Sequence, residues 1–119
     1  MGRFLAQATH GRDDPERATL PFVVANVAAS AEQETIVLLT IEGVWLATKG
    51  YADDIHHPGM QPLREVITSF LESGGEIWAC GACTKPRGIT DDDLIEGARI
   101  ISAAEFVAEL ASGTPLYTV

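Results

Sequence analysis

Apolar residues along this chain fall into two alternating patterns, short nearly continuous runs and longer stretches with helical spacing. Continuous runs of β-branched and aliphatic residues are typical of buried strands, whereas a period near 3.6 is typical of helices. The short runs predict strands at residues 3–8, 35–41, 76–80, 98–101 and 114–119. The longer stretches predict helices from about Asp13 to Ala31 and at residues 62–73 and 103–111. Strands that alternate with helices predict a parallel sheet covered on both faces.

The run at residues 35–41 carries apolar side chains at consecutive positions. Successive side chains of a strand point to opposite faces, so this run predicts an interior strand buried on both sides. In open parallel sheets, ligands collect at the carboxyl ends of the strands. We therefore expect His10, Glu42 and Cys80, each at or just after the end of a predicted strand, to lie on one edge of the sheet.

Turn and cap residues mark the boundaries of the predicted helices. Asp13 and Glu16 have the spacing of a capping box, and Pro15 suits a first helical turn. The buried stripe of this first helix is expected at Leu20, Val23, Val24, Val27 and Ala31. Further along, the sequence predicts a short helix at residues 42–49, loops at residues 51–59 and 80–88, and a short helix at residues 90–96 with a Thr90/Asp93 capping box.

The chain has 119 residues and a formal net charge of −9, from 17 acidic against 8 basic residues. This length fits one domain over residues 1–119. The negative surface repels phosphate backbones and anionic lipids, which argues against direct nucleic-acid or membrane binding and leaves a basic partner protein open. No apolar run approaches the roughly 20 residues that span a bilayer, and no secretory signal is recognisable. We expect a soluble cytoplasmic protein without a cofactor.

Only two cysteines are present, Cys80 and Cys83, which flank a Gly-Ala pair at the end of the third predicted strand. A bridge across so short a loop removes little entropy from the unfolded chain, so structural stapling explains the pair poorly. A reactive thiol needs cations or backbone N–H groups that stabilise its thiolate. Small residues let N–H groups approach the sulfur, and Lys85 and Arg87 add positive charge. The turn favours a nucleophilic or sulfur-carrying cysteine, with two buried inert thiols as the alternative.

Cys80 is expected to be the more reactive thiol and Cys83 the secondary one. A cysteine that ends a strand can present its sulfur to the carboxyl edge, where N–H groups of the following turn converge on it. These groups, with Lys85 or Arg87, would lower the pKa of Cys80 below its usual value of about 8.5. Burial acts in the opposite direction and would leave the thiol inert.

Two other uses of a Cys-x-x-Cys motif fit this sequence poorly. In thioredoxin-like proteins the motif follows an early strand and opens a long helix, whereas here it lies two-thirds along the chain and runs into a Lys-Pro-Arg-Gly segment. A structural zinc site needs four ligands, and the sequence has no second cysteine pair. His56 and His57 are adjacent and are interpreted as loop residues, so no metal site is expected.

Several other residues are candidates for the same edge. His10 could act as an acid, a base or a thiolate partner, or could be a turn histidine bonded to the backbone. Glu42 could line the same cleft, although an exposed glutamate before a helix is common. The segment around Trp45, Leu46 and Tyr51 is too apolar for a solvated connection and predicts core packing or a subunit contact.

Five sequence segments together resemble the DsrE/DsrF-like family, and within it the small YchN-like branch. They are THGRDDPERA at residues 9–18, TIEGV at 40–44, CGAC at 80–83, RGI at 87–89 and DLIEG at 93–97. The resemblance covers essentially the whole chain and implies a three-layer α/β/α sandwich around a five-stranded parallel sheet, assembled as a homotrimer or homohexamer. Relatives carry sulfur as a cysteine persulfide between donor and acceptor proteins. Their carrier cysteine matches Cys80, and Cys83 belongs to the Cys-x-x-Cys variant.

Three functions remain open on the sequence. The first is a sulfur carrier that transfers a persulfide through Cys80, with Cys83 able to resolve it as a disulfide. The second is an oligomeric binding module, without catalysis, that holds a small ligand at the carboxyl edge. The third is a thiol redox sensor that uses Cys80 and Cys83 as a reversible pair.

Overall fold

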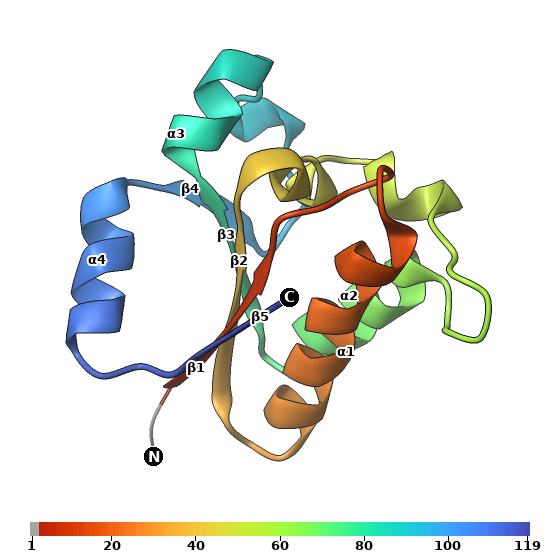
Figure 1. Cartoon of the computed structure of the whole chain (residues 1–119), viewed down its shortest axis with the longest axis horizontal. Coiled ribbons are helices and arrows are strands. Elements are labelled where there is room, and N and C mark those ends of the chain that lie inside the picture. The colour runs from red at the N-terminus through yellow and green to blue at the C-terminus, as the bar shows by residue number, and fades with distance from the viewer. Residues whose placement is uncertain (1–2) are drawn as a thin grey trace.

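The computed structural model describes residues 3–119, which fold around one parallel sheet of five strands in the order β4-β3-β2-β1-β5 (Figure 1). The strands are β1 (Arg3–Ala8), β2 (Glu34–Leu39), β3 (Glu76–Cys80), β4 (Ala98–Ile101) and β5 (Leu116–Thr118). All adjacent pairs are parallel. Every predicted strand is therefore present, although the last one is shorter than expected.

Strand β2 is the middle strand of the sheet and is buried on both faces, as its apolar run predicts. Ile36, Val37, Leu38 and Leu39 are all 0% exposed. Ile36 and Leu38 face one side of the sheet and Val37 and Leu39 the other, where they belong to two separate apolar clusters. The prediction of an interior strand is confirmed, but the strand ends before Ile41, whose backbone turns away with φ of +56°.

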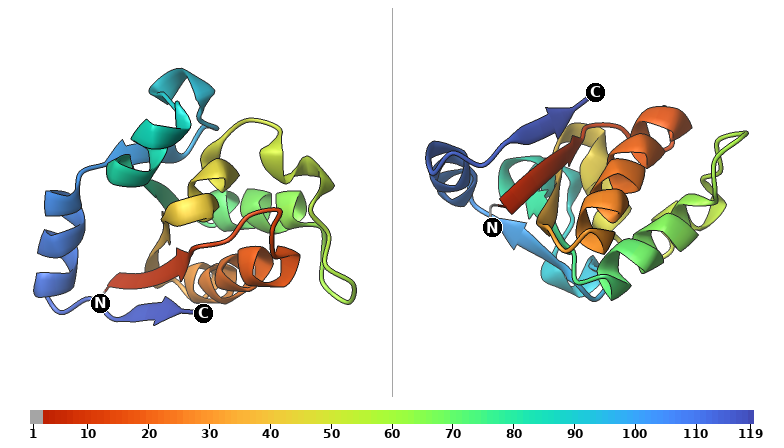
Figure 2. Two further views of the ribbon diagram at one scale, coloured as in Figure 1. Left: turned by 45° about the horizontal axis from the view of Figure 1, so that its top comes forward. Right: turned by 90° about the horizontal axis from the view of Figure 1, so that it is seen from below.

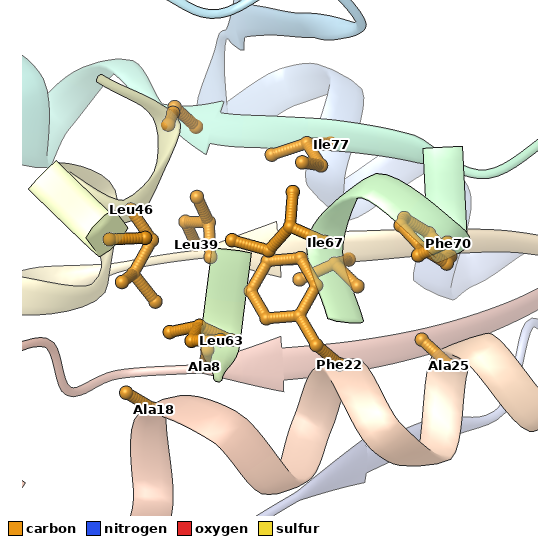
Figure 3. Packing of buried hydrophobic residues seen from close by; sticks show 14 of the residues in the cluster. Ala8, Ala18, Phe22, Ala25, Leu39, Leu46, Leu63, Ile67, Phe70 and Ile77 are labelled. Atoms are coloured by element: carbon orange, nitrogen blue, oxygen red, sulfur yellow. The ribbon is translucent and has the colours of Figure 1, made fainter. Parts of the chain in front are cut away.

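Helices cover both faces of the sheet and complete three layers (Figures 1 and 2). Helices α1 (Pro15–Ser30) and α2 (Leu63–Glu72) lie against one face, and α4 (Ala103–Ala111) lies against the other. Figure 3 shows side chains of α1, α2 and the strands converging in the larger cluster. Phe106 and Leu110 of α4 pack on the smaller cluster of Leu5, Ile36, Leu38, Trp78 and Ile101. The α/β/α sandwich is confirmed.

The buried face of α1 differs from the predicted stripe. Small residues and one aromatic face the sheet, namely Ala18, Phe22, Ala25 and Ala29, whereas Val27 is 67% exposed and Ala31 lies beyond the helix. Leu20, Val23 and Val24 are only partly buried. The helix is apolar nearly all round, so periodicity does not single out one face. Alanines let the helix approach the sheet closely, and Phe22 fills the space that remains against Phe70.

Local caps and turns correct three further predictions. Asp14, not Asp13, caps α1, because its carboxylate accepts the N–H of Arg17 at 3.0 Å while Asp13 accepts that of Gly11. Residues 51–59, predicted as a loop, begin with the 3₁₀ helix η2 (Tyr51–Asp54). The Thr90/Asp93 capping box is present, but it starts only one 3₁₀ turn, η4 (Asp91–Asp93). The short helix predicted at residues 42–49 is η1 (Ile41–Ala47).

Across residues 3–119, no helix combines the length and the apolar character that crossing a membrane requires.

Candidate functional site

The carboxyl edge of the sheet brings together the segments that the sequence singles out. Residues 9–14 follow β1, η1 follows β2, and the short helix α3 (Gly81–Thr84) with η3 (Lys85–Arg87) follows β3. The segment predicted as a loop after Cys80 is therefore helical. Its second element, η3, ends at Gly88, whose φ of +70° is in the left-handed region that favours glycine.

Cys80 and Cys83 form a pair of free thiols at the start of this turn. Cys80 is the last residue of β3 and precedes α3, and Cys83 lies within α3. Both side chains are partly exposed, and the two residues stand three positions apart on the same helical turn. The pair predicted from the sequence is therefore brought together in space, with access from solvent.

Burial raises the pKa of the Cys80 thiol above its ordinary value, and the neighbouring Cys83 acts in the same direction. The N–H groups of Ala82 and Cys83 lie close enough to lower this pKa, although they form no N-cap hydrogen bond with the side chain. The expectation that these N–H groups hold the pKa of Cys80 below its usual value is thus wrong. They act as expected, but removal of the sulfur from water outweighs them.

Arg87 joins the cysteine turn to the end of β2. Its Nε donates to Oε1 of Glu42 at 3.1 Å, and its Nη2 lies 3.1 Å from the same oxygen. Its Nη1 donates to the main-chain carbonyl of Cys83 at 3.0 Å. The positive charge of Arg87 is therefore paired with the carboxylate of Glu42. This pairing explains why Arg87 does not stabilise a Cys80 thiolate directly.

Lys85 is the other predicted cation of this turn. Its side chain is exposed and forms no ion pair within residues 3–119. Its backbone N–H donates to the carbonyl of Gly81 and closes the α3 turn. Lys85 therefore leaves a free positive charge two residues after Cys83.

His10 lies on the same edge but not beside the thiols. Its Nδ1 is 2.9 Å from the hydroxyl of Thr9, and its Nε2 is 4.0 Å from Asp13. Strand β2 separates β1 from β3, and neighbouring strands are about 4.8 Å apart. His10 therefore leaves the sheet two strands away from Cys80, and its observed contacts are those of a turn residue.

The two neighbours of Glu42 in the chain determine where its side chain lies. The sequence analysis did not identify either of them individually. Ile41 is a β-branched residue whose side chain is 54% exposed. Its φ of +56° is a strained backbone conformation that costs about 1–3 kcal/mol and persists only when the surrounding structure holds it. Gly43 allows the backbone after Ile41 to lie directly against the carbonyl oxygen of Ala8. A Cβ at this position would overlap that oxygen. The chain therefore turns sharply after β2 and directs Glu42 toward Arg87. The Glu-Gly pair after a buried strand was the available signal.

The apolar segment of η1 is mostly part of the chain's own core. Val44 and Leu46 are 0% and 1% exposed, so core packing accounts for both of them. Trp45 and Tyr51 are partly buried and stack with their ring centroids 6.0 Å apart. The guanidinium of Arg12 lies 4.3 Å from the centroid of the Tyr51 ring. These contacts tie the segments after β1 and β2 to each other.

A cavity of about 420 Å³ lies beside the cysteine turn, between η1 and the segment from η3 to η4. Trp45, Lys49 and Arg87 line it together with Ile89 and Asp93. In the part of the chain that the structure describes, no three His, Cys, Asp or Glu side chains are grouped so that they could hold a metal ion.

Comparison with known proteins identifies relatives along nearly the whole chain. The model of the DsrE/DsrF-like family matches residues 2–116. The uncharacterized protein MJ0760 of Methanocaldococcus jannaschii is 31% identical over 103 residues, which are 87% of this chain and 38% of that protein. The uncharacterized protein MK0008 of Methanopyrus kandleri is 30% identical over 103 residues, 87% of this chain and 79% of that protein. This chain thus spans well under half the length of the first relative.

Two solved structures have the same fold over their full length. The YchN protein of E. coli superposes with a TM-score of 0.81 at 19% identity, and all of each chain is covered. MTH1491 of Methanobacterium thermoautotrophicum, a protein of unknown function, superposes with a TM-score of 0.74 at 20% identity, again over all of each chain. At these identities the likeness establishes the fold.

Proposed function

This chain belongs to the DsrE/DsrF-like family, and from that premise we propose that it carries sulfur as a persulfide on Cys80. The observation that carries the proposal is the pair of partly exposed free thiols, one helical turn apart, at the carboxyl end of β3. This is the sheet edge at which parallel α/β proteins bind their ligands. Free thiols persist in reducing compartments, so a cytoplasmic location fits this chemistry.

The transfer begins when the Cys80 thiolate attacks the terminal sulfur of a donor persulfide. A new S–S bond forms on Cys80, the S–S bond of the donor breaks, and the donor leaves as a thiolate. An acceptor thiolate then removes the terminal sulfur from Cys80 in the same way. Each step moves one sulfur atom without net oxidation or reduction. Lys85, a free cation in a chain with net charge −9, favours the approach of anionic sulfur species to this turn.

Two alternatives have observations in their favour. The spacing of Cys80 and Cys83 on one helical turn also suits a reversible dithiol–disulfide pair, as in a redox sensor. The cavity beside Trp45 and Arg87 also suits a small ligand bound without covalent chemistry. Neither alternative requires a sulfur donor, so exposure to one separates all three functions.

Intact-mass spectrometry after incubation with a small organic persulfide tests the proposal. We expect the wild-type protein to gain one sulfur atom, the Cys80→Ser variant to gain none, and the Cys83→Ser variant to retain the added sulfur for longer. Serine keeps the size and polarity of cysteine but does not form a persulfide, and the double variant controls for addition elsewhere. Loss of two hydrogens by the wild-type protein, together with no sulfur gain by the Cys83→Ser variant, would establish the redox pair instead, and an unchanged mass in every variant would favour ligand binding.

We also propose that the protein is a homo-oligomer, a trimer or a hexamer, as the family resemblance implies. Core packing accounts for Val44 and Leu46, so only the partly buried Trp45 and Tyr51 of the predicted contact region remain available for an interface. Val107, Leu116 and Val119 are 62%, 38% and 39% exposed and are available for it. Multi-angle light scattering at micromolar concentration should give three or six times the chain mass of 12.7 kDa. A monomer over that concentration range would contradict the proposal.

A further inference from the structure

The structure contains a second thiol that the transfer of sulfur to an acceptor does not use. Cys83 lies on the helical turn that follows Cys80, three positions further on, yet a carrier that only passes sulfur onward gains nothing from a second thiol so near the first. A thiolate at Cys83 can attack the inner sulfur of a Cys80 persulfide. The persulfide S–S bond then breaks, a Cys80–Cys83 disulfide forms, and hydrosulfide leaves. The two cysteines are oxidised and the sulfane sulfur is reduced, so an external dithiol must reduce the disulfide before another cycle.

Whether this attack occurs depends on how firmly Cys83 is held. Helix α3 is a single turn of four residues, from Gly81 to Thr84. Few internal hydrogen bonds support so short a turn, because a helix of four residues leaves most of its N–H and C=O groups without partners inside it. The turn closes through the Lys85 N–H and the Thr84 hydroxyl, which both donate to the carbonyl of Gly81. The carbonyl of Cys83 is bonded instead by Arg87, at 3.0 Å from Nη1.

Arg87 is in turn fixed from its other side. Nε and Nη2 both lie 3.1 Å from one carboxylate oxygen of Glu42, so Glu42 and Cys83 together engage all three guanidinium nitrogens. The side chain of Arg87 is only 24% exposed. A planar guanidinium can serve two partners on different edges at once, whereas a lysine ammonium is a single point charge on a flexible stem.

The position of Glu42 is set by the backbone rather than by side-chain packing. It stands between Ile41, with its positive φ, and Gly43, which lies against the carbonyl of Ala8. The end of β2 is therefore bent at a cost in free energy, and the bend brings a carboxylate to the cysteine turn.

We infer that Glu42 and Arg87 are positioning residues that hold Cys83 against Cys80, and that they thereby direct a Cys80 persulfide toward release of hydrosulfide. The consequence for the released sulfur rests on the proposed function. The positioning of Cys83 does not, because it applies equally to the dithiol without added sulfur.

The thiol–disulfide equilibrium of the protein in a glutathione redox buffer measures the positioning directly. Its equilibrium constant reports how effectively Cys83 reaches Cys80, and no sulfur donor is needed. We expect Glu42→Gln, which keeps the shape and an acceptor oxygen of the side chain but removes its charge, to lower this constant about three- to tenfold, because a neutral amide oxygen holds Arg87 less strongly than a carboxylate does. Arg87→Lys should lower it by a similar factor. Combining the two substitutions should add little, since both release the same contact.

Glu34→Gln is the matched control. Glu34 also accepts a 3.1 Å hydrogen bond from an arginine Nε, that of Arg3, but at the opposite end of the sheet. It should leave the constant unchanged, and thermal unfolding of each variant reports any general loss of stability. If Glu42→Gln and Arg87→Lys form the disulfide as readily as Glu34→Gln, the positioning role is overturned.

The fate of the sulfur is then followed in protein loaded with an organic persulfide. Wild-type protein and Glu34→Gln should release hydrosulfide about three- to tenfold faster than Glu42→Gln, in proportion to the equilibrium constants. Equal release rates would overturn the directing role. If no variant accepts sulfur while the disulfide equilibrium still shifts, the proposed function fails and the positioning of Cys83 stands.

Discussion

Replacing Phe22 by alanine is expected to lower the free energy of unfolding by about 3–5 kcal/mol, the usual cost of truncating a fully buried aromatic side chain. Phe22 is 0% exposed, and its ring meets that of Phe70 edge-on with centroids 6.0 Å apart. Its neighbours along the buried face of α1 are alanines (Figure 3). Short alanine side chains cannot move in to fill the space, so a cavity remains.

The same helix contains the matched control. The sequence predicts that Val27 belongs to the buried stripe of this helix, yet its side chain is 67% exposed. Val27→Ala should therefore change the free energy of unfolding by less than about 0.5 kcal/mol. Equilibrium denaturation in urea, compared at equal m-value, measures both variants. If Val27→Ala lowers the free energy of unfolding more than Phe22→Ala does, the buried face of α1 is the one predicted from the sequence, not the one in the structure.

Alkylation of Cys80 is expected to be slow at neutral pH and to rise by about tenfold per pH unit until the pH approaches its raised pKa. The thiolate is the reactive form, and its fraction rises about tenfold per pH unit while the pH is below the pKa. Burial raises the pKa of Cys80 above its ordinary value, so the rise continues beyond the pH at which a free cysteine levels off. The Cys83→Ser variant isolates this thiol, and the rate against pH follows from mass spectrometry of iodoacetamide-treated samples.

The raised pKa also has a defined sign for stability. A thiol whose pKa is higher in the folded than in the unfolded protein binds its proton more tightly when folded. Its contribution to stability is complete below the unfolded-state pKa and is lost as the pH rises through the folded-state pKa. The Cys83→Ser protein should therefore lose stability in alkaline solution more steeply than the variant that also carries Cys80→Ser.

The alkylation experiment also has an outcome that would contradict the raised pKa. A rate that levels off below pH 8 would show that N–H groups, not burial, dominate at this sulfur.

Much of the fold follows from short-range patterns that are complete within each segment. A strand buried on both faces, such as β2, needs only consecutive apolar residues to be recognised. Periodicity predicts an apolar face of helix α2 at Leu63, Val66, Ile67, Phe70 and Leu71. The first four are buried, and Leu71 is only partly buried. The Thr90/Asp93 capping box is likewise a local arrangement and is present.

Predictions failed where the sequence offered two nearly equal local choices. Asp13 and Asp14 are both suitable caps, and the contacts of the preceding turn decide between them. The apolar surface of α1 runs round the helix, and the fit of alanines against the sheet selects the buried side. Both choices depend on partners distant in sequence, which a local pattern does not contain.

The sequence by itself determined the order of strands and helices, the interior position of the second strand, and the placement of the two cysteines at a strand end. These features arise from residue type and spacing within single segments. Only the tertiary structure decided which groups meet at that end. It paired Glu42 with Arg87, which are 45 positions apart in the sequence, and it placed β2 between the strands that lead to His10 and Cys80. It also made burial, rather than the nearby N–H groups, the dominant influence on the pKa of Cys80. Contact and desolvation depend on three-dimensional neighbours, so they become definite only when the sheet has brought those segments together.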